Sequence, residues 1–243
     1  MIPFPTPNRR RVYLMRHGAV TYFDETGRPI EPDTVPLNEE GRKQATAAGR
    51  TFAAENIVFD RVIVSGLPRT VETAQRVLAE MPAMQARGVA LEQWSELQEI
   101  RGGKLGEIPE HELAQAFIGV FEGTVPEERR FLHGESIGEF LDRVIPALAR
   151  LRDLPDWDTV LLVLHGGTNR AILSHAITGG ERVFFGNLAQ TAGCINALDV
   201  GDEPSDWVLR MSNFSPPSPV HFGSRLTTME VLLQQYLRYR NPA

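Results

Sequence analysis

The sequence predicts an α/β fold: a three-layer α/β/α sandwich with a mostly parallel central sheet, built as a single domain of residues 1–243. Short apolar runs recur along the chain, and segments with helical periodicity separate them. Strands that alternate with helices form a sheet covered on both faces. The length of 243 residues suits one large domain of this kind better than two small ones.

The first third of the chain supplies two strands and two helices. Residues 1–11 hold three prolines and three arginines, and we expect an extended, solvated arm. Residues 12–15 form an apolar strand that ends at a polar loop. Asn38 is a suitable N-cap for the first helix. Residues 61–65 repeat the apolar strand pattern, and residues 69–80 place their apolar side chains on one helical face.

The middle of the chain is less regular. Residues 89–91 favour a short strand. Residues 100–135 begin with a glycine-rich patch and continue as short helical pieces, so we expect a helical and looped insertion. Together with the proline-rich loop of residues 19–36, this insertion is expected to form a lid that sets specificity. Residues 136–151 form a strongly amphipathic helix.

The last third of the chain completes the sheet. Residues 159–164 are an unbroken run of apolar and β-branched residues, the clearest strand in the sequence, and residues 169–177 follow as a helix. Residues 194–200 and 207–212 indicate a hairpin at a sheet edge. The tail of residues 215–243 begins with prolines and ends in a helix, which either packs on its own domain or forms a homodimer.

The overall composition excludes several classes of partner. Apolar residues make up 42% of the chain and charged residues 23%, which is ordinary for a globular protein. The net charge of −6 argues against a nucleic-acid partner. No apolar run reaches the length of a membrane span, so no membrane partner is expected. A small anionic substrate stays compatible, because a local group of arginines can oppose the overall field.

The chain has a single cysteine, Cys194, so no intrachain disulfide can form. An apolar sequence context makes Cys194 a core residue rather than a nucleophile. No secretory signal follows the basic N-terminal residues, and we expect a reducing, cytoplasmic location.

Two histidines occupy equivalent places in the predicted sheet. His17 and His165 each follow a buried strand directly and precede a glycine. Ligands of open α/β sheets bind beyond the carboxyl ends of the strands, so both imidazoles belong to one candidate site. Gly18 and Gly166 allow the backbone to approach a ligand closely.

The residues around these histidines suit a phosphate. Arg16 and Arg69 can each donate two parallel hydrogen bonds to phosphate oxygens. The helix that follows Gly167 would add its positive N-terminal end. Glu99 precedes the glycine-rich patch and is the best-placed acid to protonate a leaving alcohol, although a solvated loop carboxylate is the alternative.

Six segments of the sequence, in this order, resemble the histidine phosphatase superfamily, also called the phosphoglycerate-mutase-like family. Together they cover about residues 12–200. The segments are residues 14–18 (LMRHG), 36–45 (PLNEEGRKQA), 65–74 (SGLPRTVETA), 97–100 (LQEI), 134–136 (GES) with Arg143, and 163–167 (VLHGG). One such segment is weak support, whereas six in order are specific.

The resemblance implies a phosphoglycerate-mutase-like fold and a phosphomonoester hydrolase that acts on a small phosphorylated metabolite without metal or cofactor. His17 is implied to form a phosphohistidine, and Arg16, Arg69 and His165 to hold the three equatorial oxygens. Glu99 is implied to act as proton donor and then as base. Attack by His17 requires an unprotonated nitrogen, so we expect its other nitrogen to donate to a backbone carbonyl.

The sequence departs from the family at two positions near the nucleophile. Ala19 and Phe23 stand where many members carry polar residues, an Asn at the second position. Part of the usual phosphate contacts must then come from elsewhere, such as Thr21 or backbone N–H groups. This departure weakens the alternative of a phosphoglycerate-type mutase. It also leaves open a catalytically weak phospho-ligand binding module.

Overall fold

The computed structural model describes residues 8–26, 28–220 and 225–240. One six-stranded sheet crosses the molecule in the order β3-β2-β4-β1-β5-β6. β1, β2, β3 and β4 run parallel, whereas β5 is antiparallel to both of its neighbours. The strands are β1 (Arg10–Arg16), β2 (Arg61–Val64), β3 (Leu91–Gln93), β4 (Thr159–Leu164), β5 (Ile195–Val200) and β6 (Trp207–Phe214).

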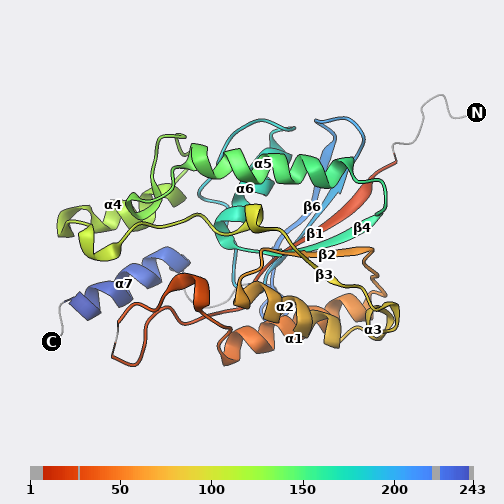
Figure 1. Cartoon of the computed structure of the whole chain (residues 1–243), viewed down its shortest axis with the longest axis horizontal. Coiled ribbons are helices and arrows are strands. Elements are labelled where there is room, and N and C mark those ends of the chain that lie inside the picture. The colour runs from red at the N-terminus through yellow and green to blue at the C-terminus, as the bar shows by residue number, and fades with distance from the viewer. Residues whose placement is uncertain (1–7, 27, 221–224, 241–243) are drawn as a thin grey trace, which may run out of the picture.

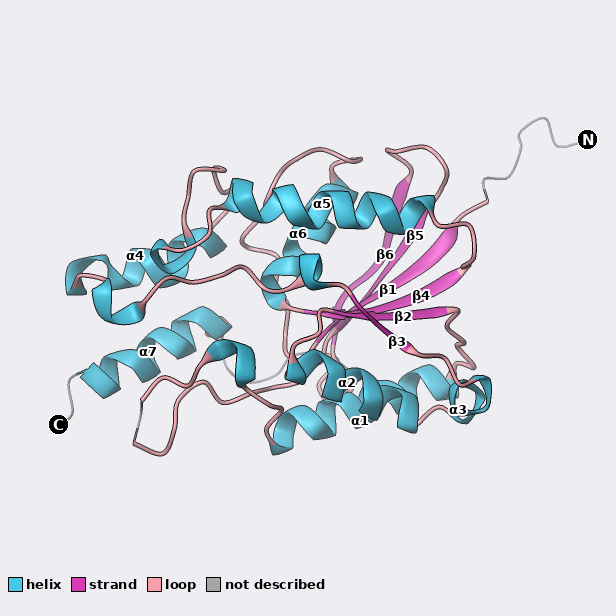
Figure 2. Cartoon of the chain, in the orientation of Figure 1, coloured by secondary structure: helices cyan, strands magenta, loops and turns pink. Residues whose placement is uncertain are grey.

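Helices cover both faces of this sheet, which confirms the predicted three-layer sandwich. Helices α5 and α6 lie on one face, and α1, α2 and α3 lie on the other (Figures 1 and 2). The seven α-helices within the described residues are α1 (Glu39–Ala54), α2 (Pro68–Ala79), α3 (Pro82–Arg87), α4 (Leu113–Ile118), α5 (Ile137–Asp153), α6 (Gly166–Ile177) and α7 (Thr228–Arg240).

Local capping explains where the two longest helices begin. The side chain of Asn38 accepts a hydrogen bond from the Gly41 N–H, as the sequence predicts. Ser136 and Glu139 form a reciprocal capping box at the start of α5. By contrast, α6 begins at Gly166 and not at residue 169, because His165 is its N-cap and the Glu99 carboxylate accepts a hydrogen bond from the Gly167 N–H in its first turn.

Each central strand buries both of its faces. Val12 and Leu14 of β1 pack into the core beneath α5 and α6. Tyr13 and Met15 point to the opposite face and pack against the α1 and α2 side. Alternate residues of β1 therefore serve two cores, which is why the strand is apolar throughout.

A third apolar cluster lies apart from the sheet, between the insertion and the C-terminal helix. We call it the lid cluster; it consists of Ile108, Leu113, Ala116, Phe117, Leu132, Leu233 and Tyr236. The Phe117 and Tyr236 rings stack with centroids 5.8 Å apart, and the Tyr236 hydroxyl donates to the Leu105 carbonyl. Helix α7 thus packs on α4 of its own domain (Figure 1).

The predicted solvated arm of residues 1–11 is wrong for the part that the structure describes; residues 1–7 lie outside it. Arg10 and Arg11 belong to β1. The arginine side chains are anchored: Arg9 pairs with Asp206, Arg10 lies over the Trp157 ring and Arg11 pairs with Asp199. Sequence inspection missed these partners because they come from segments far along the chain.

The short strand and one helix also differ from the predictions. β3 occupies Leu91–Gln93 and not residues 89–91, because its pairing with β2 starts at Leu91. The short helix α3 was not predicted. No helix in the described ranges is both long enough and apolar enough to cross a membrane.

Candidate active site

The register of β1 and β4 brings the two predicted histidines together. Arg16 is paired with Leu164 in adjacent parallel strands, so the next residues, His17 and His165, emerge side by side. The His17 N–H donates to the Leu164 carbonyl, and the two ring centroids lie 5.2 Å apart. Both rings are buried, with exposures of 2% and 0%. One phosphate-sized anion can therefore contact both.

Hydrogen bonding fixes the protonation state of His17. Its Nδ1 lies 2.7 Å from the Gly18 carbonyl oxygen, which can only accept, so Nδ1 carries the proton and Nε2 keeps its lone pair. Burial lowers the pKa of His17 well below its ordinary value, and the charges of Arg69 and Arg16 lower it further. The ring is thus held neutral with a nucleophilic Nε2.

His165 is oriented by a residue from the neighbouring strand end. Its Nε2 lies 2.7 Å from Oγ of Ser65, which directly follows β2. A hydroxyl can donate to that nitrogen, which leaves the single proton of neutral His165 on Nδ1. Burial is again the largest cause of a strongly lowered pKa, followed by the charge of Arg69. No role for Ser65 was predicted, although it belongs to a recognised segment.

Both predicted arginines lie beside the histidine pair, and each keeps N–H donors that no protein group in the described ranges accepts from. Arg16 Nη1 donates to the Gln190 carbonyl and to the Thr228 hydroxyl, and Arg69 Nη1 donates to the Pro32 carbonyl. Arg16 and Arg69 are 8% and 2% exposed as residues, and no carboxylate within the described residues pairs with either. A buried positive charge without a counter-ion favours anion binding.

The unsatisfied polar atoms point to the same place. Across residues 8–26, 28–220 and 225–240, four buried side-chain nitrogens have no hydrogen-bond partner: Arg16 Nε, Arg69 Nε, His165 Nδ1 and Arg170 Nε. An unsatisfied buried donor costs about 1–3 kcal/mol. His165 belongs to the histidine pair, and the charges of Arg16 and Arg69 act on both of its rings, so an oxygen-rich anion between them would offer acceptors to these three groups.

Two buried amide side chains, those of Gln190 and Asn196, fix the position of the Gln190 carbonyl that accepts from Arg16. The side chains of Gln190 and Asn196 exchange hydrogen bonds of 3.0 and 2.9 Å, and Asn196 also donates to the Leu14 carbonyl of β1. This arrangement holds the Gln190 carbonyl against the Arg16 guanidinium. Neither amide was predicted, because nothing local in the sequence marks them.

Glu99 belongs to a loop, and its side chain lies against the first turn of α6, the helix that follows His165. One carboxylate oxygen accepts from the Gly167 N–H at 3.0 Å, and the other accepts from the Ile100 N–H. A Cβ at position 167 would collide with this carboxylate, so glycine is required there. Glu99 is therefore a fixed group of the site and not a solvated loop acid.

Arg143 of α5 holds the segment that carries Glu99. Its guanidinium donates five hydrogen bonds of 2.7 to 2.8 Å. The acceptors are both carboxylate oxygens of Glu135 and the carbonyls of Glu96, Gln98 and Glu99. All five N–H donors of the arginine are thereby used. This explains why the GES segment, Arg143 and the acid occur together in the sequence.

Gly18, Thr21 and Phe23 each contact a residue of another segment of the chain. The Gly18 N–H donates to the Thr73 hydroxyl, and its Cα packs on Gly41 so closely that a Cβ would clash. The Thr21 hydroxyl accepts from Asn38 at an exposed position. Phe23 packs against the lid cluster, so the residue that replaces the family's Asn joins the loop to the lid.

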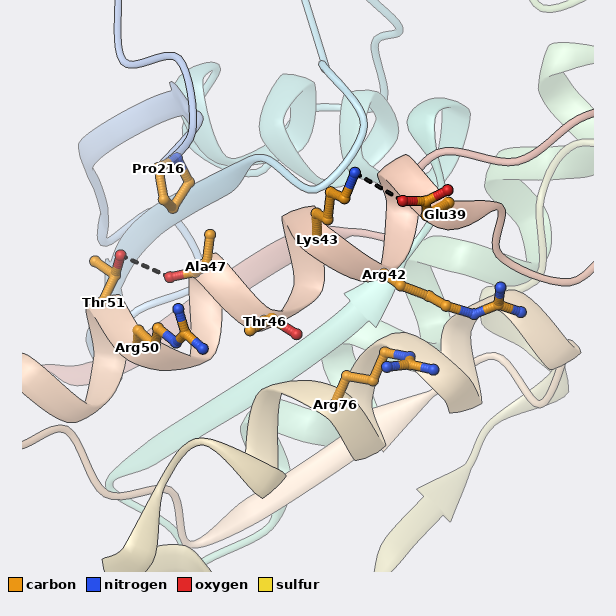
Figure 3. Close-up of a pocket in the computed structure, with 9 residues that line it drawn as sticks. All are labelled: Glu39, Arg42, Lys43, Thr46, Ala47, Arg50, Thr51, Arg76 and Pro216. Carbon is orange, nitrogen blue, oxygen red and sulfur yellow. Dashed lines mark hydrogen bonds and ion pairs between the residues drawn. The ribbon is translucent and has the colours of Figure 1, made fainter.

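A surface hollow whose lining includes none of the predicted site residues does not resemble an anion site. It encloses about 590 Å³ over α1 and α2 and is lined by several cations (Figure 3). These cations are neutralised: Arg42 and Arg76 share Glu72, Arg50 pairs with Glu80 and Lys43 pairs with Glu39. The histidine centre is the stronger candidate because its guanidinium groups are unpaired.

Comparison with known proteins agrees with this geometry. Residues 12–214 match the family model described as the histidine phosphatase superfamily (branch 1). The chain is 33% identical over 164 residues to the Escherichia coli protein named "Probable phosphoglycerate mutase GpmB", a match covering 64% of this chain and 69% of the relative.

Solved structures share the fold. The alpha-ribazole phosphatase of Shigella flexneri has a TM-score of 0.62 at 22% identity, over 84% of this chain and 96% of that one. A mycobacterial glucosyl-3-phosphoglycerate phosphatase in complex with inorganic phosphate has a TM-score of 0.62 at 24% identity, over 85% and 98%. With the family model spanning most of its length, the chain belongs to the histidine phosphatase superfamily, branch 1.

Proposed function

We propose that this protein is a phosphomonoester hydrolase that acts on a small phosphorylated metabolite through a phosphohistidine at His17. The observation that carries the proposal is the pair of neutral, buried imidazoles with centroids 5.2 Å apart. Arg16 and Arg69 beside them carry unpaired charge and unpartnered Nε donors. Phosphoryl transfer needs such positioning and charge stabilisation more than any other form of catalysis.

In the first step, His17 Nε2 attacks phosphorus, the bond between phosphorus and the ester oxygen breaks, and Glu99 protonates the departing alcohol. In the second step, the Glu99 carboxylate takes a proton from water, whose oxygen attacks the phosphohistidine. The N–P bond breaks, inorganic phosphate leaves and His17 becomes neutral again. Arg16, Arg69 and His165 stabilise the three equatorial oxygens in both steps.

We favour hydrolysis over mutase chemistry. A mutase must return the phosphoryl group to a bound product, which requires tight retention of both. Ala19 and Phe23 supply no polar side chain to such a site, and Phe23 is used in lid packing. Two of the structurally similar proteins are named as phosphatases, whereas the curated relative is named as a probable mutase.

The test is a phosphate-release screen over a panel of phosphorylated metabolites, with and without chelator, for the wild type and His17→Ala. We expect the variant to lose at least about ten-thousand-fold in kcat, because the nucleophile is gone. Chelation should leave the wild-type rate unchanged. His175→Ala, which alters a partly buried histidine of α6 outside the site, serves as the matched control.

Wild type quenched in alkaline denaturant during turnover should also carry phosphate on His17 that is stable in base and released in acid. An isomerised ester without inorganic phosphate would favour the mutase. Binding of phosphorylated ligands with no phosphate release at any pH would overturn the proposal in favour of a binding module.

A further inference from the structure

Arginines elsewhere in this molecule show which edge of a guanidinium holds an anionic group. Three of them donate from Nε and Nη2 to the two oxygens of one carboxylate: Arg61 to Glu92, Arg143 to Glu135 and Arg182 to Glu127. The N–H bonds of Nε and Nη2 are parallel on one edge of the planar group, so that edge matches two oxygens of a carboxylate or a phosphate.

Arg16 and Arg69 keep this same edge free. Across residues 8–26, 28–220 and 225–240, neither Nε nor Nη2 of these arginines donates to a protein group. Nε of Arg16 lies 3.5 Å from the position that a Cβ would take on Gly166, the residue directly after His165. The free edge of Arg16 therefore lies beside the histidine pair, where a phosphoryl group can accept from it.

The third nitrogen of each arginine is bound to a segment outside the sheet. Nη1 of Arg69 donates to the Pro32 carbonyl at 2.6 Å, and Pro32 belongs to the loop of residues 19–36. Nη1 of Arg16 donates to the Gln190 carbonyl at 2.5 Å and to the Thr228 hydroxyl at 3.1 Å. In both arginines, one end is held by the protein and the other end is left for a ligand.

Thr228 belongs to α7, which packs on the lid cluster and not on the sheet. Leu233 and Tyr236 of α7 are members of that cluster, and the Tyr236 hydroxyl donates to the Leu105 carbonyl of the insertion. Arg16 is the last residue of β1. The hydrogen bond between Arg16 and Thr228 thus joins the C-terminal helix to the end of the strand that carries the nucleophile.

The start of α7 does not need the Thr228 hydroxyl. The Thr227 hydroxyl accepts from the Glu230 N–H at 3.2 Å, and the Glu230 carboxylate accepts from the Thr227 N–H at 2.6 Å. This reciprocal capping box fixes the first turn of the helix without Thr228. Thr228 is exposed as a residue, yet its side chain contacts an arginine that is only 8% exposed.

We propose that Thr228 is a positioning residue, whose hydroxyl holds Nη1 of Arg16 so that the Nε and Nη2 edge faces the phosphoryl group. This inference rests on the proposed function, because it requires Arg16 to bind that group. An arginine loses rotamer freedom when it binds an anion, and a guanidinium already held at Nη1 loses less. Since one guanidinium contacts both partners, phosphate binding and the docking of α7 favour each other by the same factor.

The first test measures binding of inorganic phosphate by calorimetry in the wild type, Thr228→Val and Thr228→Ser. Thr228→Val removes the hydroxyl and should weaken phosphate binding about 3- to 10-fold, as expected for the loss of one hydrogen bond. Thr228→Ser keeps the hydroxyl and should bind phosphate within about twofold of the wild type. Thr227→Val is the matched control, because it removes the neighbouring hydroxyl, which bonds to Glu230 and not to Arg16.

The second test measures hydrogen exchange of residues 228–240 with and without saturating phosphate. In the wild type, phosphate should slow exchange in α7 about 3- to 10-fold, because the coupling is reciprocal. Thr228→Val should lose this slowing. Thr227→Val weakens the helix cap and should speed exchange in α7, but phosphate should still slow it. A role of Thr228 in helix stability alone would leave the effect of phosphate unchanged.

Unchanged phosphate affinity in Thr228→Val would overturn the proposal, and so would a wild type that binds no phosphate. Equal losses of affinity in Thr228→Val and Thr227→Val would also overturn it, since both hydroxyls would then act only on the stability of α7. The same holds if Thr228→Ser is as weak as Thr228→Val. Thr228→Ala repeats the comparison if Thr228→Val does not fold.

Neither measurement requires turnover, so the two proposals can fail separately. Phosphate binding that depends on Thr228, in a protein that releases phosphate from no ester of the panel, would refute the hydrolase and keep the positioning role. Phosphate release by the wild type, with a phosphate affinity that does not depend on Thr228, would do the reverse.

Discussion

At the scale of single residues, the buried histidines link stability to pH. The pKa of His17 and of His165 is lowered from an ordinary value of 6.5, with burial as the largest cause. Below pH 6.5 the unfolded chain binds protons that the folded chain does not, so the free energy of unfolding falls as pH falls. Each histidine contributes up to about 1.4 kcal/mol per pH unit until pH reaches its folded pKa.

We therefore expect His17→Gln to flatten this dependence. Its free energy of unfolding, from urea titrations between about pH 7 and pH 5, should fall less steeply than that of the wild type. His111→Gln, at a side chain that is 81% exposed, should keep the wild-type slope. Parallel curves for the wild type and His17→Gln would show that His17 does not titrate as described.

Glu99 gives a second prediction at this scale. Glu99→Gln keeps the shape of the side chain but cannot donate or accept the proton, so kcat/KM, which reports only the first step, should fall about 10²- to 10⁴-fold for an alkyl phosphate. An aryl phosphate, whose leaving group needs little protonation, should lose much less. Steady-state rates for the two esters provide the measurement. A uniform loss would assign Glu99 a positioning role through its bonds to Gly167 and Ile100 instead.

At the scale of elements, the nucleophile loop depends on a backbone contact. Gly18 and Gly41 pack so closely that a Cβ on either would meet the backbone beside it. This contact docks the segment after β1 onto the first turn of α1.

Gly18→Ala should consequently destabilise the fold by about 2 kcal/mol or more and displace His17, lowering kcat as well. Denaturant unfolding and phosphate release provide the two measurements. Gly106→Ala is the matched control, because no atom lies within 4 Å of a Cβ built there. A stable and fully active Gly18→Ala protein would contradict the packing argument.

At the scale of the whole molecule, the lid cluster joins three distant parts of the chain. The insertion, α7 and Phe23 of the N-terminal loop pack together, and Thr228 of α7 also accepts a hydrogen bond from Arg16. The buried histidines lie on the sheet side of this assembly. We propose that this assembly forms a lid, which moves relative to the sandwich when substrate enters.

Truncation inside the lid cluster should loosen the lid selectively. Phe117→Ala removes a 2% exposed ring at a cost of about 3–5 kcal/mol, most of it local to the lid. Hydrogen exchange should accelerate in residues 105–133 and 228–240 while the strands stay protected, and KM should rise. Phe59→Ala, at a fully buried ring of the sandwich core, should instead weaken the whole sheet. Equal exchange profiles for the two variants would contradict an independently moving lid.

The amino-acid sequence by itself determined the sheet layers, the capped helices and the two histidine positions. Strands, caps and strand ends are marked by local patterns, as the β4 run of residues 159–164 and the Asn38 cap illustrate. The family resemblance also predicted Arg16, Arg69 and Glu99 as site residues, a prediction that needs no distances. The errors, such as the start of α6 and the arm before β1, arose where long-range contacts outweighed local preference.

Only the tertiary structure decided which side chains complete the site. Ser65 meets His165 across 100 residues of sequence, Arg16 meets Gln190 across 174, and Thr228 meets Arg16 across 212. Strand register and lid packing bring these groups together, and neither leaves a pattern along the chain. The unpaired charges of Arg16 and Arg69 became visible for the same reason: that no carboxylate among the described residues pairs with them can be recognised only from contacts in space.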